Sequence, residues 1–531
     1  MRCANLEDSI IIPYKDSISL SEVCLLIKNN NMSRTSNSMK MVIASTLCQV
    51  VVLVCGLILP PLLISQYGSE VNGLLNLVKQ LMSYFGIVCL GLGVSAQVAL
   101  YKPIADNDWK AINAILAAAK HFYNVSGALF AGLIFLSSAI VPFVVDSTIP
   151  TLDIVLVILI TGIGSISEYV VISKYKVFLS ANQKQYINSR ITAEGILLNT
   201  IVSVLLIKCN CSIIIIQLGS SIVYVLRLLY TIRYVKKNYP LISFSAEKPV
   251  LETMQNRWSA FSYQLSHMII NLSPMIIVSI AASLSDASVF SVYFMVFSSL
   301  AMVAGIFSSG LQAPFGDILA KDETETLKNA FSSFEFLYTL VLSICFCCGM
   351  LLMISFVGSY IHNDDGVDYI RHWFSFFMCI SFFVTNFRIP FTTLVEAKGL
   401  FKVNNKYNLW EAIAFIASAI PMVYYWGIIG IAVAGVATGL PRTLHYIIYC
   451  RRNFGEAVNV FKLLLKLVLT TVLSSCLYFL LQPSAEDNVF MWFIYVLPYV
   501  LIAIICVTVL HIAIDYRAFR IVFKRFAEYH K

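Results

Sequence analysis

Long uninterrupted runs of apolar residues, separated by short polar segments, set the pattern of this chain. The runs are about 20 residues long, the length that an α-helix needs to cross the hydrocarbon core of a bilayer. They lack the alternation of apolar and polar residues that membrane β-strands show. The pattern predicts fourteen membrane-spanning helices, over roughly residues 41–65, 73–99, 122–145, 151–173, 191–208, 212–232, 258–282, 287–316, 331–358, 372–396, 408–426, 428–449, 463–482 and 488–513. The predicted fold class is therefore an all-α polytopic membrane protein.

Composition narrows the class of protein further. Hydrophobic residues make up 59% of the 531 positions and charged residues 12%, and the mean hydropathy is +0.80. A soluble domain has roughly 45–50% apolar and about 25% charged residues. A soluble enzyme, a fibrous protein and a disordered chain are therefore excluded. The net charge of +8 predicts no nucleic-acid partner, because the position of the basic residues relative to the spans explains it better.

Lysine and arginine residues fix the predicted orientation of the helices. With the N-terminus placed in the cytoplasm, 30 of the 37 basic residues fall in cytoplasmic segments and five lie inside spans. Only Lys208 and Arg371 fall on the external side of the membrane. Cytoplasmic loops of membrane proteins carry this excess of positive charge. Both termini are therefore predicted to be cytoplasmic. The external loops are short, the longest covering about residues 359–371.

A weak internal repeat divides the spans into two sets. Residues 111–123 (AINAILAAAKHFY) resemble residues 326–338 (TLKNAFSSFEFLY) at an offset of 215, and Asp108 matches Asp322 at an offset of 214. Because each copy has an even number of helices, both copies insert in the same orientation, as a parallel repeat about an axis along the membrane normal. The predicted architecture is two six-helix lobes plus two C-terminal helices.

These patterns divide the chain into six segments. They are a cytoplasmic N-terminal extension (1–40), an N-lobe (41–233), a cytoplasmic linker (234–257), a C-lobe (258–450), the last two spans (451–513) and a basic cytoplasmic tail (514–531). Two interpretations of the extension stay open: it belongs to the functional chain, or that chain begins at Met32 or Met39. The tail interleaves basic and aromatic residues directly after a span, which favours an anchor at the membrane interface.

Charged residues inside spans cost about 2.5–3.5 kcal/mol each at the centre of a helix, so each requires an explanation. Lys79 lies roughly 9 Å from the external end of its span. It either snorkels to the outer interface or faces the cleft between the two lobes, as a cavity cation that attracts a phosphate. Arg388 either pairs with Glu168 across the two lobes or snorkels to the cytoplasmic side. Snorkelling is the favoured interpretation for the other three basic residues in spans, Arg227, Arg442 and Lys466.

A polar stripe runs along span seven. Gln264, His267 and Asn271 follow the spacing i, i+3 and i+7, which places them on one face of the helix. Such a stripe either forms hydrogen bonds between helices or lines a transport cavity. No metal site is predicted, because the one Cys-x-x-Cys pair, Cys345 and Cys348, lies in an apolar run without a second pair.

Motifs of nucleotide-dependent and hydrolytic enzymes are absent from the sequence. It contains no P-loop, H-E-x-x-H, G-x-S-x-G or dinucleotide-binding fingerprint. The chain is therefore predicted not to be an enzyme, to need no cofactor, and not to drive transport by hydrolysing ATP itself.

The segment from Pro60 to Leu100 resembles a known family. The first helix ends in Pro60-Pro61-Leu-Leu-Ile-Ser, the sequence Tyr67-Gly68-Ser-Glu-Val-Asn-Gly follows, and a long helix ends in Gly91-Leu-Gly-Val-Ser-Ala. This arrangement is similar to the start of polysaccharide and O-antigen flippases in the multidrug/oligosaccharidyl-lipid/polysaccharide exporter superfamily. The plan of 6+6+2 helices resembles that superfamily over residues 32–515.

The resemblance implies a flippase of the bacterial cell (inner) membrane. It would move an oligosaccharide linked to polyprenyl pyrophosphate to the outer leaflet by alternating access. The implied partners are this lipid-linked oligosaccharide, membrane lipids, and the polymerase and chain-length machinery of a surface polysaccharide. Related flippases hold the pyrophosphate with cavity cations, which makes Lys79 the first candidate, on its location. The candidate substrate-binding residues are Lys79, Gln264, His267, Asn271 and Arg388.

Three other classes of protein stay open. A multidrug and toxin extrusion antiporter would have the same lobes. Those antiporters commonly use N-lobe acids to bind sodium or protons, whereas span one here has none and only Asp153, Glu168 and Glu194 remain. A sugar polymerase or ligase is disfavoured by the short external loops. The last class is a non-transporting scaffold within a synthesis complex.

Overall fold

The protein is built from long apolar helices, as its sequence pattern predicts. The computed structural model describes residues 20–89, 92–182, 184–243, 272–306, 315, 318–319, 324–361, 366–398, 400–486 and 488–529. Among these residues, 12 helices are long and apolar enough to cross a membrane, and none of these residues forms a strand. The predicted all-α fold class is thereby confirmed, and the chain is a multi-pass membrane protein.

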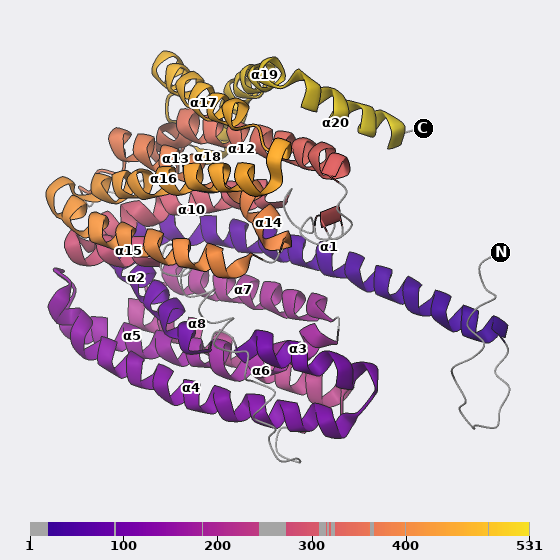
Figure 1. The fold of residues 1–531 in the computed structure, drawn as a ribbon. Helices are drawn as coiled ribbons and strands as arrows, with labels where there is room; N and C mark the ends of the chain where they lie inside the picture. The colour runs from indigo at the N-terminus through magenta and orange to yellow at the C-terminus, as the bar shows by residue number, and fades with distance from the viewer. Residues whose placement is uncertain are drawn as a thin grey trace.

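The helices follow one another with few long connections. In chain order they are α1 (Leu20–Tyr67), α2 (Ser69–Phe85), η1 (Gly86–Cys89), α3 (Leu92–Ala105), α4 (Trp109–Val144), α5 (Thr151–Ile166), the π-helix η2 (Ser167–Ile172), α6 (Ser173–Ala181), α7 (Gln185–Lys208), α8 (Ile213–Asn238), α10 (Leu284–Ile306), α12 (Thr324–Tyr360), α13 (His372–Phe387), α14 (Ile389–Ala397), α15 (Phe401–Trp426), α16 (Ile428–Phe454), η4 (Gly455–Ala457), α17 (Val460–Leu481), α18 (Val489–Tyr495), α19 (Leu497–Ile514) and α20 (Tyr516–Tyr529). Figure 1 shows them as a bundle in which the start of α1 and the end of α20 lie at the same end.

Twelve of the fourteen predicted spans correspond to these long helices. The second predicted span is broken instead: α2 gives way to the 3-10 helix η1, and α3 begins at Leu92. The break coincides with the closely spaced glycines Gly86, Gly91 and Gly93, which weaken a helix. Of the seventh predicted span, the structure describes the helix Leu272–Ala281.

Two very short connections separate neighbouring spans. Asn210 turns the chain between α7 and α8 with a φ of 54°, and Gly427 does so between α15 and α16 with a φ of 59°. Glycine adopts this left-handed backbone at no steric cost, and asparagine tolerates it better than most residues. The helices on either side of each turn are therefore antiparallel neighbours.

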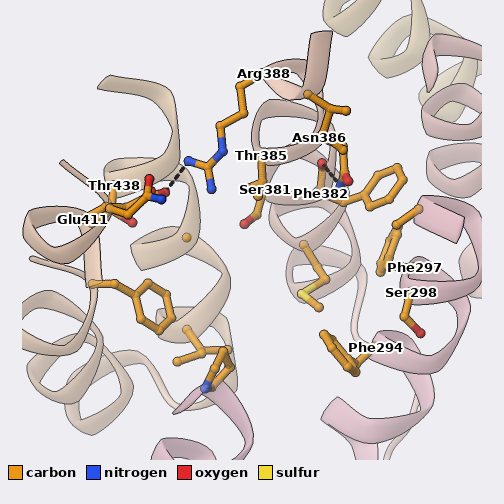
Figure 2. A pocket seen from close by; sticks show the side chains of 18 of the residues that line it. Phe294, Phe297, Ser298, Ser381, Phe382, Thr385, Asn386, Arg388, Glu411 and Thr438 are labelled. Atoms are coloured by element: carbon orange, nitrogen blue, oxygen red, sulfur yellow. Dashed lines mark hydrogen bonds and ion pairs between the residues drawn. The ribbon is translucent and has the colours of Figure 1, made fainter. Parts of the chain in front are cut away.

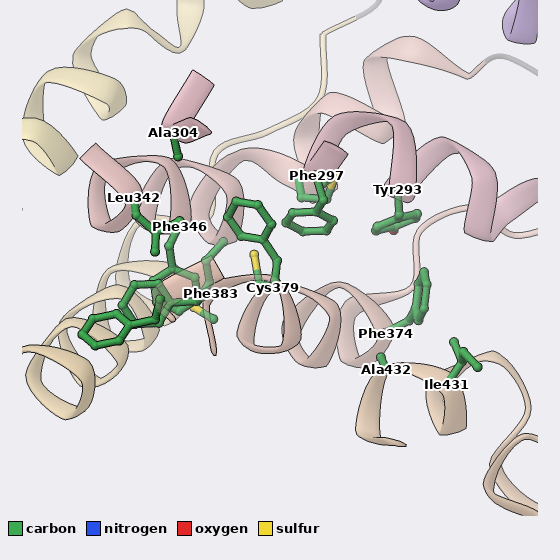
Figure 3. Packing of buried hydrophobic residues seen from close by; sticks show 14 of the residues in the cluster. Tyr293, Phe297, Ala304, Leu342, Phe346, Phe374, Cys379, Phe383, Ile431 and Ala432 are labelled. Atoms are coloured by element: carbon green, nitrogen blue, oxygen red, sulfur yellow. The ribbon is translucent and has the colours of Figure 1, made fainter. Parts of the chain in front are cut away.

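Each half of the chain has its own hydrophobic core. Two clusters of buried side chains consist of residues before 240, with Leu284 as the one buried member from the second half. The largest cluster consists of residues after 270, with Ile64 as the one buried member from the first half. In the large cluster the rings of Phe346 and Phe383 stack with centroids 4.3 Å apart (Figure 3). The described buried residues therefore form two packed units.

The two units meet where α2 passes α10. Asn72 donates its side-chain amide to Ser288 at 2.6 Å, and one turn later Asn76 donates to Ser291 at 3.0 Å. A Cβ placed on Gly73 would overlap the backbone carbonyl of Leu284, so only glycine permits this approach. Because α2 begins where α1 ends, this junction lies at the end of the bundle opposite the start of α1.

A buried ion pair attaches α17 to the second half. Lys466 on α17 is fully buried, and its Nζ donates to the two carboxylate oxygens of Glu335 on α12 at 2.9 and 3.1 Å. Asp515, between α19 and α20, lies 3.9 Å from the same Nζ. The snorkelling prediction for Lys466 is wrong, because α12 supplies a carboxylate at the depth of the ammonium group.

Candidate functional site

Two cavities lie inside the bundle, one in each half. The first-half cavity has a volume of about 210 Å³, and its described lining residues come from α1, α2, α5, η2, α7 and α8. The second-half cavity has a volume of about 460 Å³ and is lined by Pro274 and by residues of α10, α13, α14, α15 and α16. Counted within each half, both cavities use the first, second, fourth, fifth and sixth spans.

The repeat offset relates the two linings residue by residue. Seven pairs of lining residues are separated by 215 positions: Leu59 and Pro274, Leu75 and Phe290, Lys79 and Phe294, Met82 and Phe297, Ser83 and Ser298, Ile216 and Ile431, and Ser220 and Gly435. The cavities therefore occupy equivalent places in the two halves. Their chemistry differs, because a lysine in the first corresponds to a phenylalanine in the second.

The fourth span of each half is interrupted beside its cavity. In the first half the π-helix η2 separates α5 from α6 and carries Glu168. In the second half α13 ends at Phe387, Arg388 follows, and Pro390 stands at the start of α14. A proline lacks the backbone N–H that would continue the helical ladder. Interrupted helices in corresponding positions of two halves are a frequent mark of a transport site.

Lys79 on α2 lines the first-half cavity with an exposed side chain. None of the described carboxylates lies within ion-pair distance of it. The only other charged group in the described lining is Glu168, which is neutralised by Lys176 and Arg227. Counted together with these two partners of Glu168, the charged groups at this cavity have an excess of positive charge.

The remaining first-half lining is rich in hydroxyl and amide groups. They belong to Ser83, Thr161, Ser165, Tyr169, Asn199, Ser203, Gln217, Ser220, Ser221 and Tyr224. The sequence pattern did not single out this set, although serine, asparagine and glutamine within an apolar run can indicate polar contacts between helices. The surroundings of Lys79 can donate and accept several hydrogen bonds.

Arg388 lines the second-half cavity and pairs with Glu411 on α15 at 2.5 Å (Figure 2). Arg442 on α16 approaches the other carboxylate oxygen of Glu411 at 3.8 Å, outside hydrogen-bond distance. That oxygen, Oε2, is buried and accepts no hydrogen bond from the described residues. Figure 2 shows Phe294, Phe297 and Phe382 on the side of the cavity away from Glu411 and Thr438.

Several predicted positions of charged residues require correction. The Glu168–Arg388 pair between the lobes is not formed, because each residue has partners within its own half. Arg227 and Arg442 do not snorkel: their side chains are only 6% exposed, and each faces a carboxylate on a neighbouring helix. The fourth and fifth spans supply these acids at the depth of the guanidinium groups, so the arginines remain inside.

Two further predictions concern the location of candidate residues. Lys79 was expected to face a cleft between the lobes, whereas all described residues around it belong to the first half. Gln264, His267 and Asn271 lie outside the described residues. Within the described part of the chain, no group of three or more His, Cys, Asp or Glu side chains is arranged to hold a metal ion.

Comparison by sequence finds no relative. No family model matches the chain, and no curated protein matches it.

Comparison by structure does find relatives. One match is described as lipid II flippase MurJ in an inward closed conformation, with a TM-score of 0.65 and 14% identity over 90% of this chain and 99% of that chain. Another is an inward-facing multidrug resistance MATE family transporter of the MOP superfamily, with a TM-score of 0.59 and 12% identity over 77% and 95% of the two chains. An outward-facing transporter of the same description has a TM-score of 0.54 and 12% identity, over 80% of this chain and 96% of that chain. The chain has the fold that these transporters share.

Proposed function

We propose that the protein is a flippase that moves a polyprenyl-pyrophosphate-linked oligosaccharide to the outer leaflet of a bacterial inner membrane for surface polysaccharide biosynthesis. The observation that carries the proposal is Lys79, a cation without a carboxylate partner among the described residues, in a cavity whose described lining is rich in hydroxyl and amide groups. The likeness to a lipid II flippase over nine tenths of the chain supports the same class of substrate.

Electrostatics explains why an uncompensated lysine suits this substrate. A cation within a membrane helix costs several kcal/mol of insertion free energy, on the order of 3. A diphosphate offsets that cost, because opposite charges attract far more strongly where the dielectric constant is low than in water. Hydroxyl and amide groups such as those of Asn199 and Gln217 can donate to the remaining phosphate oxygens.

The closed junction between α2 and α10 fits the inward-facing step of such a cycle. The halves are held together by Asn72 and Asn76 at the end of the bundle opposite the start of α1. The distribution of lysine and arginine predicts that this end is external. Alternating access would then require the junction to separate while the cytoplasmic ends of the halves approach each other.

The test is export of surface polysaccharide in a flippase-deficient strain that carries Lys79 variants at matched expression. Lys79→Ala should abolish export, and Lys79→Arg should retain it, because a point charge suffices to attract the phosphate. Lys208→Ala is the control: it removes the same charge from an exposed lysine at the end of α7. Full export by Lys79→Ala would show that the proposal is wrong.

A multidrug antiporter is the second candidate, favoured by the likeness to MATE transporters. It would need an acid that binds and releases a cation, and Glu168 is the acid in the described lining of the first-half cavity. The contacts of Glu168 with Lys176 and Arg227 oppose that role, since both partners already neutralise it. Drug resistance that depends on Glu168 but not on Lys79 would establish the antiporter instead.

A further inference from the structure

The second-half cavity combines an aromatic wall, a polar wall and balanced charge. We infer that it binds neutral sugar rings of the transported oligosaccharide, an inference that rests on the proposed function. Lys79 and the first-half cavity would then hold the diphosphate, and the second-half cavity the glycan.

The aromatic wall is formed by neighbouring phenylalanines of α10 and α13. Phe290 and Phe294 stack with ring centroids 5.6 Å apart, and Phe297 lies 5.4 Å from Phe382. Aromatic rings present an electron-rich face, onto which the C–H groups of a sugar ring can pack. The first-half cavity has Leu75, Lys79 and Met82 at the positions of Phe290, Phe294 and Phe297, and the aromatic rings in its described lining are those of Tyr169 and Tyr224.

The polar wall provides hydrogen-bonding groups for hydroxyls. Ser381 and Thr385 lie on α13, Thr438 lies on α16, and Arg388 reaches from the end of α13 toward Glu411 (Figure 2). A ligand between the two walls would contact phenyl rings on one side and hydroxyl, guanidinium and carboxylate groups on the other. In ligand sites with an apolar lining, a few convergent polar groups fix the orientation of the ligand in this way.

The described charges at this cavity balance when Arg442, the ion-pair neighbour of Glu411, is counted with the lining. Arg388 and Arg442 carry two positive charges, and Glu396 and Glu411 carry two negative charges. A phosphate or a free cation would therefore gain no net attraction here, in contrast to the excess positive charge of the first-half cavity. A neutral polyhydroxyl ligand has the charge that this cavity accommodates.

The Arg388–Glu411 pair fixes a hydrogen-bond donor at the cavity wall. Glu411 is 8% exposed, and its Oε1 pairs with Arg388 at 2.5 Å, while its Oε2 is buried 3.8 Å from Nε of Arg442. The carboxylate therefore holds the Arg388 guanidinium in place at the cavity wall. A guanidinium has five N–H donors, and those that do not bond Glu411 can donate to sugar hydroxyls. The volume of about 460 Å³ lies in the range of small-ligand sites, roughly 300–1,000 Å³.

The test measures binding of neutral sugars to the full-length protein in lipid nanodiscs. Lactose and N,N′-diacetylchitobiose serve as probes in saturation-transfer NMR, which detects weak binding. Wild type should transfer saturation to the sugars. Glu411→Gln and Phe294→Leu should bind about tenfold more weakly, because the first releases Arg388 from its ion pair and the second removes a phenyl ring. Phe377→Leu is the matched control, since Phe377 lies on α13 outside the described cavity lining and stacks with Trp373.

The outcomes separate this inference from the proposed function. If wild type binds neither sugar, or all four proteins bind equally, the inference is wrong, even where Lys79 is required for export. If Lys79→Ala exports normally while Phe294→Leu loses sugar binding, the proposed function fails and the sugar site stands. Should Glu411→Gln unfold, as judged by its thermal midpoint, Phe294→Leu decides the question.

Discussion

Asn72 on α2 donates a hydrogen bond to Ser288 on α10, a residue 216 positions later in the chain. Asn76 and Ser291, which are also bonded, are 215 positions apart. The sequence repeat has the same offset, so the second helix of one half contacts its counterpart in the other at equivalent positions. The two-fold axis of a homodimer produces the same kind of contact. The pseudo-two-fold axis of this chain therefore passes between α2 and α10.

Gly73 should control the closeness of this contact. Gly73→Ala places a methyl group against the Leu284 carbonyl. We expect this overpacking to destabilise the closed junction by about 1–3 kcal/mol. Spin labels on the ends of α2 and α10 should report a longer distance in the variant. Gly132→Ala on α4 is the control, because a Cβ there meets open space. An unchanged distance in Gly73→Ala would contradict the close approach.

Removing one partner of the buried Lys466–Glu335 pair should destabilise the protein strongly. Lys466→Met leaves the Glu335 carboxylate without its buried counter-ion, with an expected loss of about 3–5 kcal/mol. Glu335→Met should cost less, because Lys466 keeps Asp515 at 3.9 Å. The double variant Lys466→Met/Glu335→Met should recover much of that loss in thermal unfolding measured in detergent. Arg190→Gln is the control and should cause no measurable loss, because its pair with Glu194 is exposed. Additive losses in the double variant would mean that the two residues do not interact.

The predicted orientation can be checked with reporter fusions. Fusions after residues 210, 365 and 485 should be external, and fusions after 245 and 455 cytoplasmic, because of the positive charge on the segments that flank the latter. Figure 1 agrees in placing the start of α1 and the end of α20 at one end of the bundle. An external reporter at 245 would contradict this topology.

Helix α20 should lie at the membrane surface. Tyr516, Phe519 and Phe523 form one aromatic stripe with centroids 6.3 and 6.0 Å apart, while the exposed Arg517 lies about 120° around the helix from Phe523. Ala518 is buried in a cluster with Phe336 and fixes the rotation of the helix. Spin labels at 523 should therefore be accessible to oxygen, which concentrates in lipid, and labels at 517 to a water-soluble relaxer. Equal accessibility at both positions would place α20 in water.

The sequence predicted the helices well because apolar length is a local property. The offset of the sequence repeat also relates Arg227 to Arg442, which stand 215 positions apart. In the structure both are buried and face an acid. The partners of these arginines were not predictable, because the depth of a residue in its span does not reveal which helix lies beside it. Glu168 was assigned to the wrong arginine for this reason.

The cavities were harder to predict than the spans. Lys79 could be singled out, because a single charge in an apolar run is conspicuous. The phenylalanines of α10 could not, since aromatic residues in a membrane span are as common in ordinary packing as in binding sites. Only the arrangement of Phe294 and Phe382 opposite Glu411 distinguishes them.

The distance in sequence between Glu335 and Lys466 affects how the protein is made. The carboxylate of α12 is synthesised 131 residues before its ammonium partner on α17. At about 5–20 residues per second, roughly 7–26 s pass before the partner emerges from the ribosome. During that time the nascent ninth span carries a charge without this counter-ion. A chain that stops before α17 keeps this defect permanently, so the last two spans complete a membrane insertion that begins four helices earlier.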